Sequence, residues 1–522
     1  MRLLRATLGV LLVVMAGCQR AESDKPTAPE QPVAAEASGI HWFEGDVDAA
    51  FVAAAAEKKP VFLYWGAEWC PPCHELKAHV FSRLDFQEKL KQFIPVYLDG
   101  DAPGAQLSGE QFRVSGYPTA LVLAPDRTEI ARIAGGQDLS SYAELLDLAL
   151  DQVTPLSQVL ATLRSSETAK LARSDCRRIA YNGWALDPQV EAGELIGDLT
   201  LAADRCPVEA VHERDRLLLA AADLAARAER KTVETGNPPS ERLTKLLDGV
   251  DALLADDARA LATSDALLSL GEDFFVLERL ARPARITAFR ARWFALMDRI
   301  EIDGRLSPSS QLLSAASRLQ AAKSLESSGN IPDAVATRSR QTLDAFLARD
   351  YDADARSALV NSASWVLTLL GDDDRLRGLL ENQIRTSGTP YYYLPDLADL
   401  EEKAGRKTEA LALLERGYRE SRGIATRFQW GGLYVNGLLR MSPRDEPRIR
   451  AALLDVIAEL DGPNRIHARA RSRLERLRPA LATWADETKN RPTLAAVGER
   501  WEQICNGLPE SDPIRAECSR LL

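Results

Sequence analysis

Histidine is scarce in this chain, and its five His residues show no metal-ligand spacing beyond the proximity of His74 to a cysteine pair. Basic residues are outnumbered, with 65 Lys and Arg against 76 Asp and Glu, a net charge of −11 and no basic run. This balance argues against nucleic acid as a partner. After residue 16 no apolar run is long enough to span a bilayer. We therefore expect no metal site, no cofactor and no membrane-spanning segment.

The length of 522 residues exceeds what one compact core supports, so two or more domains are expected. Apolar residues make up 46% and charged residues 27%, which is typical of globular protein.

The N-terminus has the form of a targeting segment. Arg2 and Arg5 precede an apolar stretch, Leu8 to Ala16, that is too short to span a membrane. The stretch ends in Met15-Ala16-Gly17-Cys18, which resembles the lipobox of bacterial lipoproteins. The resemblance implies a signal peptide over residues 1–18, acylation of Cys18, and a lipid-anchored protein on the periplasmic side of a bacterial membrane. Gln19, in place of Asp, leans towards the outer membrane; an ordinary cleaved signal is the alternative.

The next 130 residues divide into a tether and a mixed domain. Residues 19–39 are rich in Ala, Pro, Glu and Ser without periodicity, which indicates a flexible linker. Residues 40–152 alternate in pattern and predict an α/β domain. The expected strands are Pro60–Trp65, Phe93–Leu98, Thr119–Ala124 and Glu129–Ala134, and the expected helices are Asp46–Lys58, Pro71–Phe81, Asp85–Gln92, Gln106–Phe112 and a closing helix, Leu139–Gln152.

The remaining chain, residues 155–522, shows no strand pattern, and its apolar positions recur at three- and four-residue spacing. It is expected to be all α. Gly329, Gly371 and Gly405 stand at similar helix ends, 42 and 34 residues apart, as in the turns of tetratricopeptide repeats. A tetratricopeptide-like α-solenoid and an irregular helical bundle both remain open.

The strongest clue to chemistry is Cys70-Pro71-Pro72-Cys73, which follows the apolar run Val61–Trp65 and opens a predicted helix. Two thiols separated by two residues on a first helical turn can close into one disulfide. The positive end of the helix also favours a thiolate at the first of them. The pattern therefore predicts dithiol–disulfide exchange.

Residues 40–152 resemble the thioredoxin superfamily. The resemblance is carried by Trp69 with the CxxC motif, by Val114-Ser115-Gly116-Tyr117-Pro118-Thr119, whose Pro118 lies 45 residues after Cys73, and by Gly135-Gly136 before the closing helix. Lys59-Pro60-Val61 and Leu76-Lys77 bring it nearest the C-terminal domain of DsbD-type interchange proteins and related lipoprotein thioredoxins.

This resemblance implies a role for each site residue. Cys70, the more exposed sulfur, is the nucleophile that forms a mixed disulfide, and Cys73 resolves it. Pro118 is expected in cis, presenting a backbone edge to an extended substrate. Trp69, Tyr117 and Thr119 are expected to line the substrate site, although plain core packing is an alternative for Trp69 and Tyr117.

The chain departs from the family at one important position. Tyr64 stands where thioredoxins carry a buried Asp that helps to deprotonate the resolving thiol, and the position of its partnering Lys falls near Pro95. Water or Glu68 would have to accept the proton, although a solvated Glu68 is the simpler interpretation.

Two other interpretations use the same motif. Cys70 to His74 also fits the attachment pattern of c-type haem, and His74 beside the cysteines could belong to a zinc site. Neither explains the preceding strand or the Pro118 loop. His74 is expected to be an exposed helix residue, which could lower a thiol pKa if protonated.

Four further cysteines remain, in two locally spaced pairs. We expect Cys176–Cys206 and Cys505–Cys518 disulfides, as suits an oxidising compartment; four free buried thiols are the alternative.

The sequence as a whole predicts a periplasmic, lipid-anchored thiol–disulfide oxidoreductase of the reductase or interchange kind, with a helical region that binds partners. Its expected partners are thiol or disulfide-containing proteins and a membrane electron donor. The alternative is a chaperone-like or assembly scaffold in which the thioredoxin-like domain serves for docking.

Overall fold

The computed structural model describes residues 39–102, 104–114, 116–134, 146–147, 154–166, 168, 170–184 and 192–522. The expected signal peptide, its Cys18 and nearly all of the linker lie outside these residues, as does the Gly135-Gly136 pair. Only residues 146–147 of the expected closing helix are described, and they are helical.

In the described part of the N-terminal domain, β1 (Val61–Gly66), β2 (Ile94–Asp99), β3 (Thr119–Leu123) and β4 (Glu129–Ala134) form a mixed sheet in the order β2-β1-β3-β4. β1 is parallel to β2 and antiparallel to β3, and β3 is antiparallel to β4. Every residue of β1 is buried, which explains why this central strand reads as a continuous apolar run.

The helices described in full beside the sheet are α1 (Val47–Glu57), α2 (Pro71–Leu76), α3 (Leu84–Leu90) and α4 (Ala105–Gln111). Asp46 caps α1, since its carboxylate accepts the Ala49 N–H at 2.7 Å. α2 continues into a π-helical segment, Lys77–Phe81. These elements confirm the predicted α/β fold.

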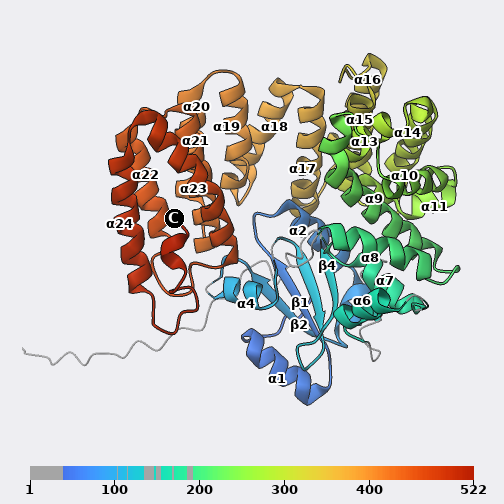
Figure 1. The fold of residues 1–522 in the computed structure, drawn as a ribbon, viewed down its shortest axis with the longest axis horizontal. Helices are drawn as coiled ribbons and strands as arrows, with labels where there is room; N and C mark the ends of the chain where they lie inside the picture. The colour runs from blue at the N-terminus through green and yellow to red at the C-terminus, as the bar shows by residue number, and fades with distance from the viewer. Residues whose placement is uncertain are drawn as a thin grey trace, which may run out of the picture.

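From residue 154 onwards the described chain is helical and contains no strand, as predicted. Figure 1 shows these helices arching over one end of the sheet, from α6–α8 beside the sheet to α22–α24 on the opposite side. The bounds are α6 (Leu156–Ser165), α7 (Arg173–Tyr181), α8 (Ala192–Arg205), α9 (Val211–Glu234), α10 (Glu241–Leu254), α11 (Asp257–Ala262), α12 (Ser264–Leu268), α13 (Glu272–Ala281), α14 (Ile286–Ile302), α15 (Pro308–Leu325), α16 (Asp333–Leu347), α17 (Ala353–Leu370), α18 (Asp373–Thr386), α19 (Leu394–Lys403), α20 (Lys407–Glu420), α21 (Ile424–Met441), α22 (Glu446–Ala458), α23 (Ala468–Thr488) and α24 (Arg491–Gly507), with short 3₁₀ turns at Pro283–Arg285, Pro390–Tyr392 and Cys518–Arg520.

The three glycines of the sequence repeat lie in the turns α15–α16, α17–α18 and α19–α20, between helices that pack on each other. Their φ angles are +66°, +65° and +79°, a left-handed conformation that favours glycine. Helix pairs are therefore present at the predicted places, while a specific tetratricopeptide architecture stays a prediction.

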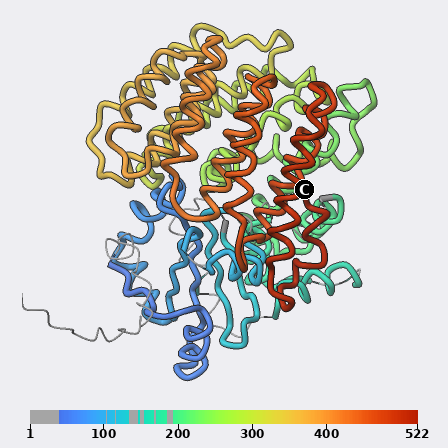
Figure 2. Tube along the Cα trace, turned by 90° about the vertical axis from the view of Figure 1, so that its left-hand side faces the viewer, coloured from blue at the N-terminus to red at the C-terminus, as the bar shows by residue number. Residues whose placement is uncertain are grey.

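The helical region contacts the N-terminal domain on two sides. Buried Arg178 of α7 donates to Ile130 O of β4 at 2.8 Å and to Thr154 O at 2.6 Å. On another side, α17 packs against α2. Figure 2 shows the rows of helices above the sheet from the side. No helix among the described residues has the length and apolar character needed to cross a membrane.

Candidate active site

The cysteine pair lies where β1 passes into α2. Cys70 is the N-cap of α2 and forms a disulfide with Cys73, with their Cα atoms 5.2 Å apart. Pro71 and Pro72 occupy the first helical positions, where a missing N–H costs nothing. The Cys73 N–H points at Cys70 Sγ at 3.3 Å. A thiolate at Cys70 would therefore meet both this donor and the positive helix end.

The Pro118 loop faces the motif as the sequence implied. The Tyr117–Pro118 peptide is cis, and Thr119 follows it at the start of β3, paired with Trp65 of β1. Tyr117 packs against the cysteine pair. Thr119 differs from the prediction: it is fully buried and its hydroxyl donates to Gly116 O at 3.0 Å, so its side chain faces the interior and not a substrate.

Trp69 is held by residues from both regions. Its indole N–H points at Asp101 Oδ2 (3.2 Å) and at Thr426 Oγ1 (2.9 Å) of α21. The Thr426 hydroxyl and N–H both donate to Asp101, at 2.7 and 3.1 Å. Burial raises the pKa of Asp101, although these donors oppose the shift. Trp430 meets the Trp69 ring edge to face with centroids 5.1 Å apart, and Tyr392 stacks on it at 5.9 Å.

Gly423 shows how closely α21 approaches this point. A Cβ built on Gly423 would lie 2.3 Å from Asp101 Cβ, and its φ is +75°. Only glycine fits here, because both the backbone conformation and the close approach exclude a side chain.

Helix α23 also contacts the thioredoxin-like domain, through Tyr117 beside the motif and through Glu110 of α4. The guanidinium of Arg469 lies 4.3 Å from the centroid of the Tyr117 ring, and Arg471 pairs with Glu110 at 2.9 Å. Together with the Trp69 contacts, these residues leave Cys70 2% exposed and Cys73 fully buried. Cys70 is thus the more exposed of the two cysteines, as expected, although both are buried.

Two stacked tyrosine rings occupy the place where thioredoxins carry the buried Asp. Tyr64 lies opposite Tyr97 of β2 with ring centroids 5.5 Å apart, whereas Pro95 pairs with Phe62. The predicted partner position is therefore displaced by two residues. A carboxylate does lie nearby: Asp99 ends β2 beside Gly66, and burial raises its pKa to about 6 although the Asp101 N–H donates to it at 3.0 Å.

His74 is not the exposed residue that the sequence suggested. Its side chain is 18% exposed, its Nδ1 lies 2.5 Å from Asp354 Oδ1 of α17, and its Nε2 lies 2.7 Å from Glu68 O. The described residues contain no group of three or more His, Cys, Asp or Glu side chains placed to hold a metal.

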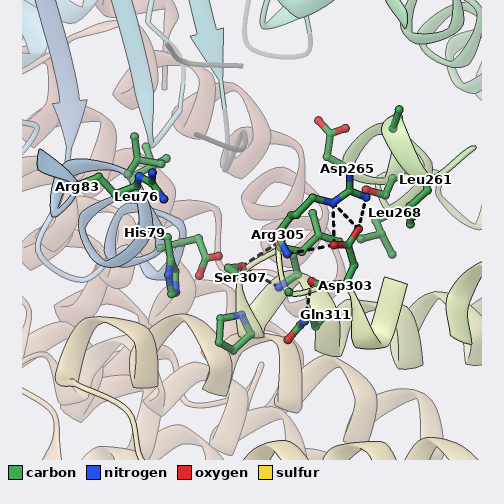
Figure 3. Close-up of a pocket in the computed structure, with 18 of the residues that line it drawn as sticks. Leu76, His79, Arg83, Leu261, Asp265, Leu268, Asp303, Arg305, Ser307 and Gln311 are labelled. Atoms are coloured by element: carbon green, nitrogen blue, oxygen red, sulfur yellow. Dashed lines mark hydrogen bonds and ion pairs between the residues drawn. The ribbon is translucent and has the colours of Figure 1, made fainter. Parts of the chain in front are cut away.

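Two cavities flank α2. One, of about 870 Å³, lies between the α2 side and the segments 261–268 and 303–311; Figure 3 shows His79 and Ser307 in it, with Arg305 paired to Asp303. Burial raises the pKa of Glu75 in its wall, against a hydrogen bond with Ser307. The other, of about 830 Å³, lies between Glu68, His74 and Lys77 and the helices α17 and α18.

The other four described cysteines form two disulfides outside the CxxC motif. Cys176 of α7 is bonded to Cys206, which follows α8, and Cys505 of α24 is bonded to Cys518. Each bond ties neighbouring segments of the helical region.

Sequence reasoning missed the residues that the helical region adds to the site: Asp101, Asp354, Thr426, Trp430 and Arg469. One signal was present, since Asp99-Gly100-Asp101 ends a strand near the motif. The tyrosine run after Pro390 and the Trp430 segment are aromatic in a region otherwise rich in Ala and Leu.

Comparison with known proteins agrees with this geometry. Residues 42–125 match the model of a thioredoxin-like family. A segment of 99 residues is 32% identical to the thiol:disulfide interchange protein DsbD of Yersinia pestis, strains Pestoides F and Antiqua, and covers 18% of this chain and 17% of each relative. The chain thus spans about a sixth of the length of these relatives. The part of the chain that carries the CxxC disulfide and the cis-proline is a thioredoxin-like domain similar to part of DsbD.

Proposed function

We propose that the protein is a thiol–disulfide oxidoreductase of the reductase or interchange kind. The observation that carries the proposal is the Cys70–Cys73 disulfide at the N-terminus of α2, with the cis Pro118 loop beside it. The similarity of this segment to DsbD, a thiol:disulfide interchange protein, supports the same chemistry.

The reaction follows from the two sulfurs. In the reduced enzyme the Cys70 thiolate attacks one sulfur of a substrate disulfide, forming a mixed disulfide and releasing one substrate thiolate. Cys73 loses its proton and attacks Cys70 Sγ. The second substrate thiolate leaves, and the Cys70–Cys73 disulfide forms again. Two electrons pass to the substrate, so a dithiol donor must reduce the enzyme after each turnover.

The cellular setting belongs to the same proposal. We infer a protein anchored through lipid on Cys18, at the periplasmic side of a bacterial membrane and with the outer membrane favoured. Its substrates are thiol or disulfide-containing proteins, and its electron donor is a membrane protein. The support is the lipobox-like Met15 to Cys18 and the two further disulfides, which suit an oxidising compartment.

Insulin reduction by the mature chain, with dithiothreitol as donor, tests the activity. Cys70→Ser and Cys73→Ser should each abolish turnover, while a Cys505→Ser/Cys518→Ser variant should retain it, since that pair lies outside the CxxC motif. Equal rates for the parent and Cys70→Ser would reject the proposal.

One observation favours a second candidate, an assembly scaffold. The disulfide is covered by α21 and α23, with Cys70 only 2% exposed. A scaffold would bind its partner equally well with both cysteines replaced by serine. An oxidoreductase would lose a covalent, reductant-sensitive complex on the same replacement.

A further inference from the structure

Both ring nitrogens of His74 face oxygen atoms. Nδ1 faces Asp354 Oδ1 at 2.5 Å and Nε2 faces Glu68 O at 2.7 Å. A carbonyl oxygen only accepts hydrogen bonds, and an ionised carboxylate does the same. Both contacts are satisfied together when each ring nitrogen donates, and only the imidazolium carries two N–H groups.

The charges around the ring keep the Asp354 carboxylate ionised. Burial raises the pKa of Asp354, but the hydrogen bond and charge of His74, with the charge of Lys77, outweigh it and lower the pKa overall. Burial in turn lowers the pKa of Lys77, opposed by Asp354, Glu68 and Asp99. The charged groups Asp352 and Arg356 also face this place, because they line the cavity of about 830 Å³ that His74 borders.

His74 follows Cys70 by one helical turn. The backbone N–H of His74 donates to Cys70 O at 3.1 Å. The Nε2 contact turns the ring back towards Glu68, which precedes Cys70 by two residues. A charged ring at this position would lie within one helical turn of Cys70, and a nearby cation favours a thiolate.

We propose that Asp354 is a positioning residue for the redox centre: it holds His74 as an imidazolium beside Cys70 and so favours the reduced form. Reduction of the disulfide takes two electrons and one proton and gives a Cys70 thiolate and a Cys73 thiol. The proposal rests on the proposed function, and it makes the redox equilibrium depend on a residue of the helical region 280 positions away.

The test compares Asp354→Asn, Asp354→Glu and the exposed control Asp350→Asn in the full mature chain. Nitrogen NMR of His74 should show two protons on the ring at pH 8 in the parent. In Asp354→Asn the ring should carry only one of these protons at pH 8. Alkylation of reduced Cys70 at pH 7.5 should slow about three- to tenfold in this variant.

The equilibrium with glutathione should move by the same factor towards the disulfide in Asp354→Asn. This corresponds to a reduction potential about 14–30 mV lower. His74→Gln should shift the equilibrium in the same direction, Asp354→Glu should restore the parent's values, and Asp350→Asn should change none of them. A structural role alone would alter stability without moving the ring titration.

A neutral His74 ring at pH 8 in the parent would overturn the inference. Faster alkylation of Cys70 in Asp354→Asn would also overturn it. That result would mean that the negative charge of Asp354 disfavours the Cys70 thiolate more than the charged His74 ring favours it. These readouts need no protein substrate. If the parent fails to reduce insulin but Asp354→Asn shows the expected shifts, the proposed function alone is rejected. If the parent reduces insulin but the reduction potential of Asp354→Asn equals that of the parent, this inference alone is rejected.

Discussion

The indole N–H of Trp69 and the hydroxyl of Thr426 lie 2.9 Å apart although 357 positions separate them in the chain. Trp69 directly precedes the nucleophilic cysteine, and Thr426 lies in the first turn of α21. Both also bind the carboxylate of Asp101. The helical region is therefore hydrogen-bonded to the residue that borders the disulfide, and we expect access to Cys70 to require this contact to open.

Loss of the Thr426 hydroxyl should expose the disulfide. Thr426→Val keeps the shape but removes both the acceptor for Trp69 and a donor to Asp101, which weakens the closed arrangement by roughly 1–3 kcal/mol. We expect reduction of Cys70–Cys73 by dithiothreitol to be several-fold faster, measured by quenched alkylation and mass spectrometry. Thr368→Val, at an exposed position of α17, is the matched control; equal rates in the two variants would mean that α21 does not limit access.

Asp99 should make the protein less stable as the pH rises. Its pKa is about 6 in the folded chain against an ordinary 3.8, so the folded state holds this proton more tightly than the unfolded state. Stability from this group is therefore greatest below about pH 3.8 and falls until about pH 6. Asp99→Asn should be roughly 2–3 kcal/mol more stable than the parent at pH 7.5 and about equal at pH 4, in urea unfolding.

Asp126 provides a control of opposite sign. The Thr128 N–H donates to its carboxylate at 2.9 Å and lowers its pKa, so its contribution is present at neutral pH and is lost on acidification. Asp126→Asn should therefore lose stability at pH 7.5. If Asp99→Asn also loses stability at pH 7.5, the assigned effect of burial on Asp99 is wrong.

The part of the site that local sequence determines was predictable. The strand before the motif, the Pro-Pro helix start and the cis Pro118 depend on neighbouring residues and fixed spacing. The displacement from Pro95 to Tyr97 has a different origin, because the register of the parallel β1–β2 pair depends on side-chain packing across the sheet and not on spacing along the chain.

Contacts between distant segments were not predictable from the single sequence. Asp101 and Thr426 are 325 positions apart, and His74 and Asp354 are 280 apart. No periodicity or motif connects such residues, since their meeting depends on the summed turns of many helices. For that reason the sequence suggested an exposed His74, whereas its partner Asp354 comes from the helical region.

The two structural disulfides should differ in what they contribute. Cys176–Cys206 closes a separation of 30 residues and Cys505–Cys518 one of 13. Loss of either disulfide should lower the free energy of unfolding by about 2–4 kcal/mol. Loss of Cys176–Cys206 should lower it by about 0.7 kcal/mol more than loss of the other, because a disulfide that closes a longer loop restricts the unfolded chain more. Paired Cys→Ser variants in urea unfolding measure both costs. The reverse order would show that native-state effects, and not loop entropy, dominate.

Cys18 should carry lipid if the lipobox interpretation holds. Cys18→Ser should move the protein into the soluble periplasmic fraction or block its processing, because two or more acyl chains are what gives stable attachment. Intact-mass measurement and membrane fractionation check this. A Cys18→Ser protein that is processed normally and stays in the membrane would contradict the anchor.

The roles of Cys70 and Cys73 should appear in trapping experiments. Cys73→Ala leaves the Cys70 thiolate without a resolving thiol, so mixed disulfides should accumulate, whereas Cys70→Ala should trap nothing. Because Trp69 and Thr426 hold the site closed, Cys73→Ala/Thr426→Val should trap several-fold more partner than Cys73→Ala with Thr368→Val. Non-reducing gels of cells expressing each variant give the yields. Trapping by Cys70→Ala that equals trapping by Cys73→Ala would reverse the assigned roles, and no gain from Thr426→Val would show that a substrate reaches Cys70 without moving α21.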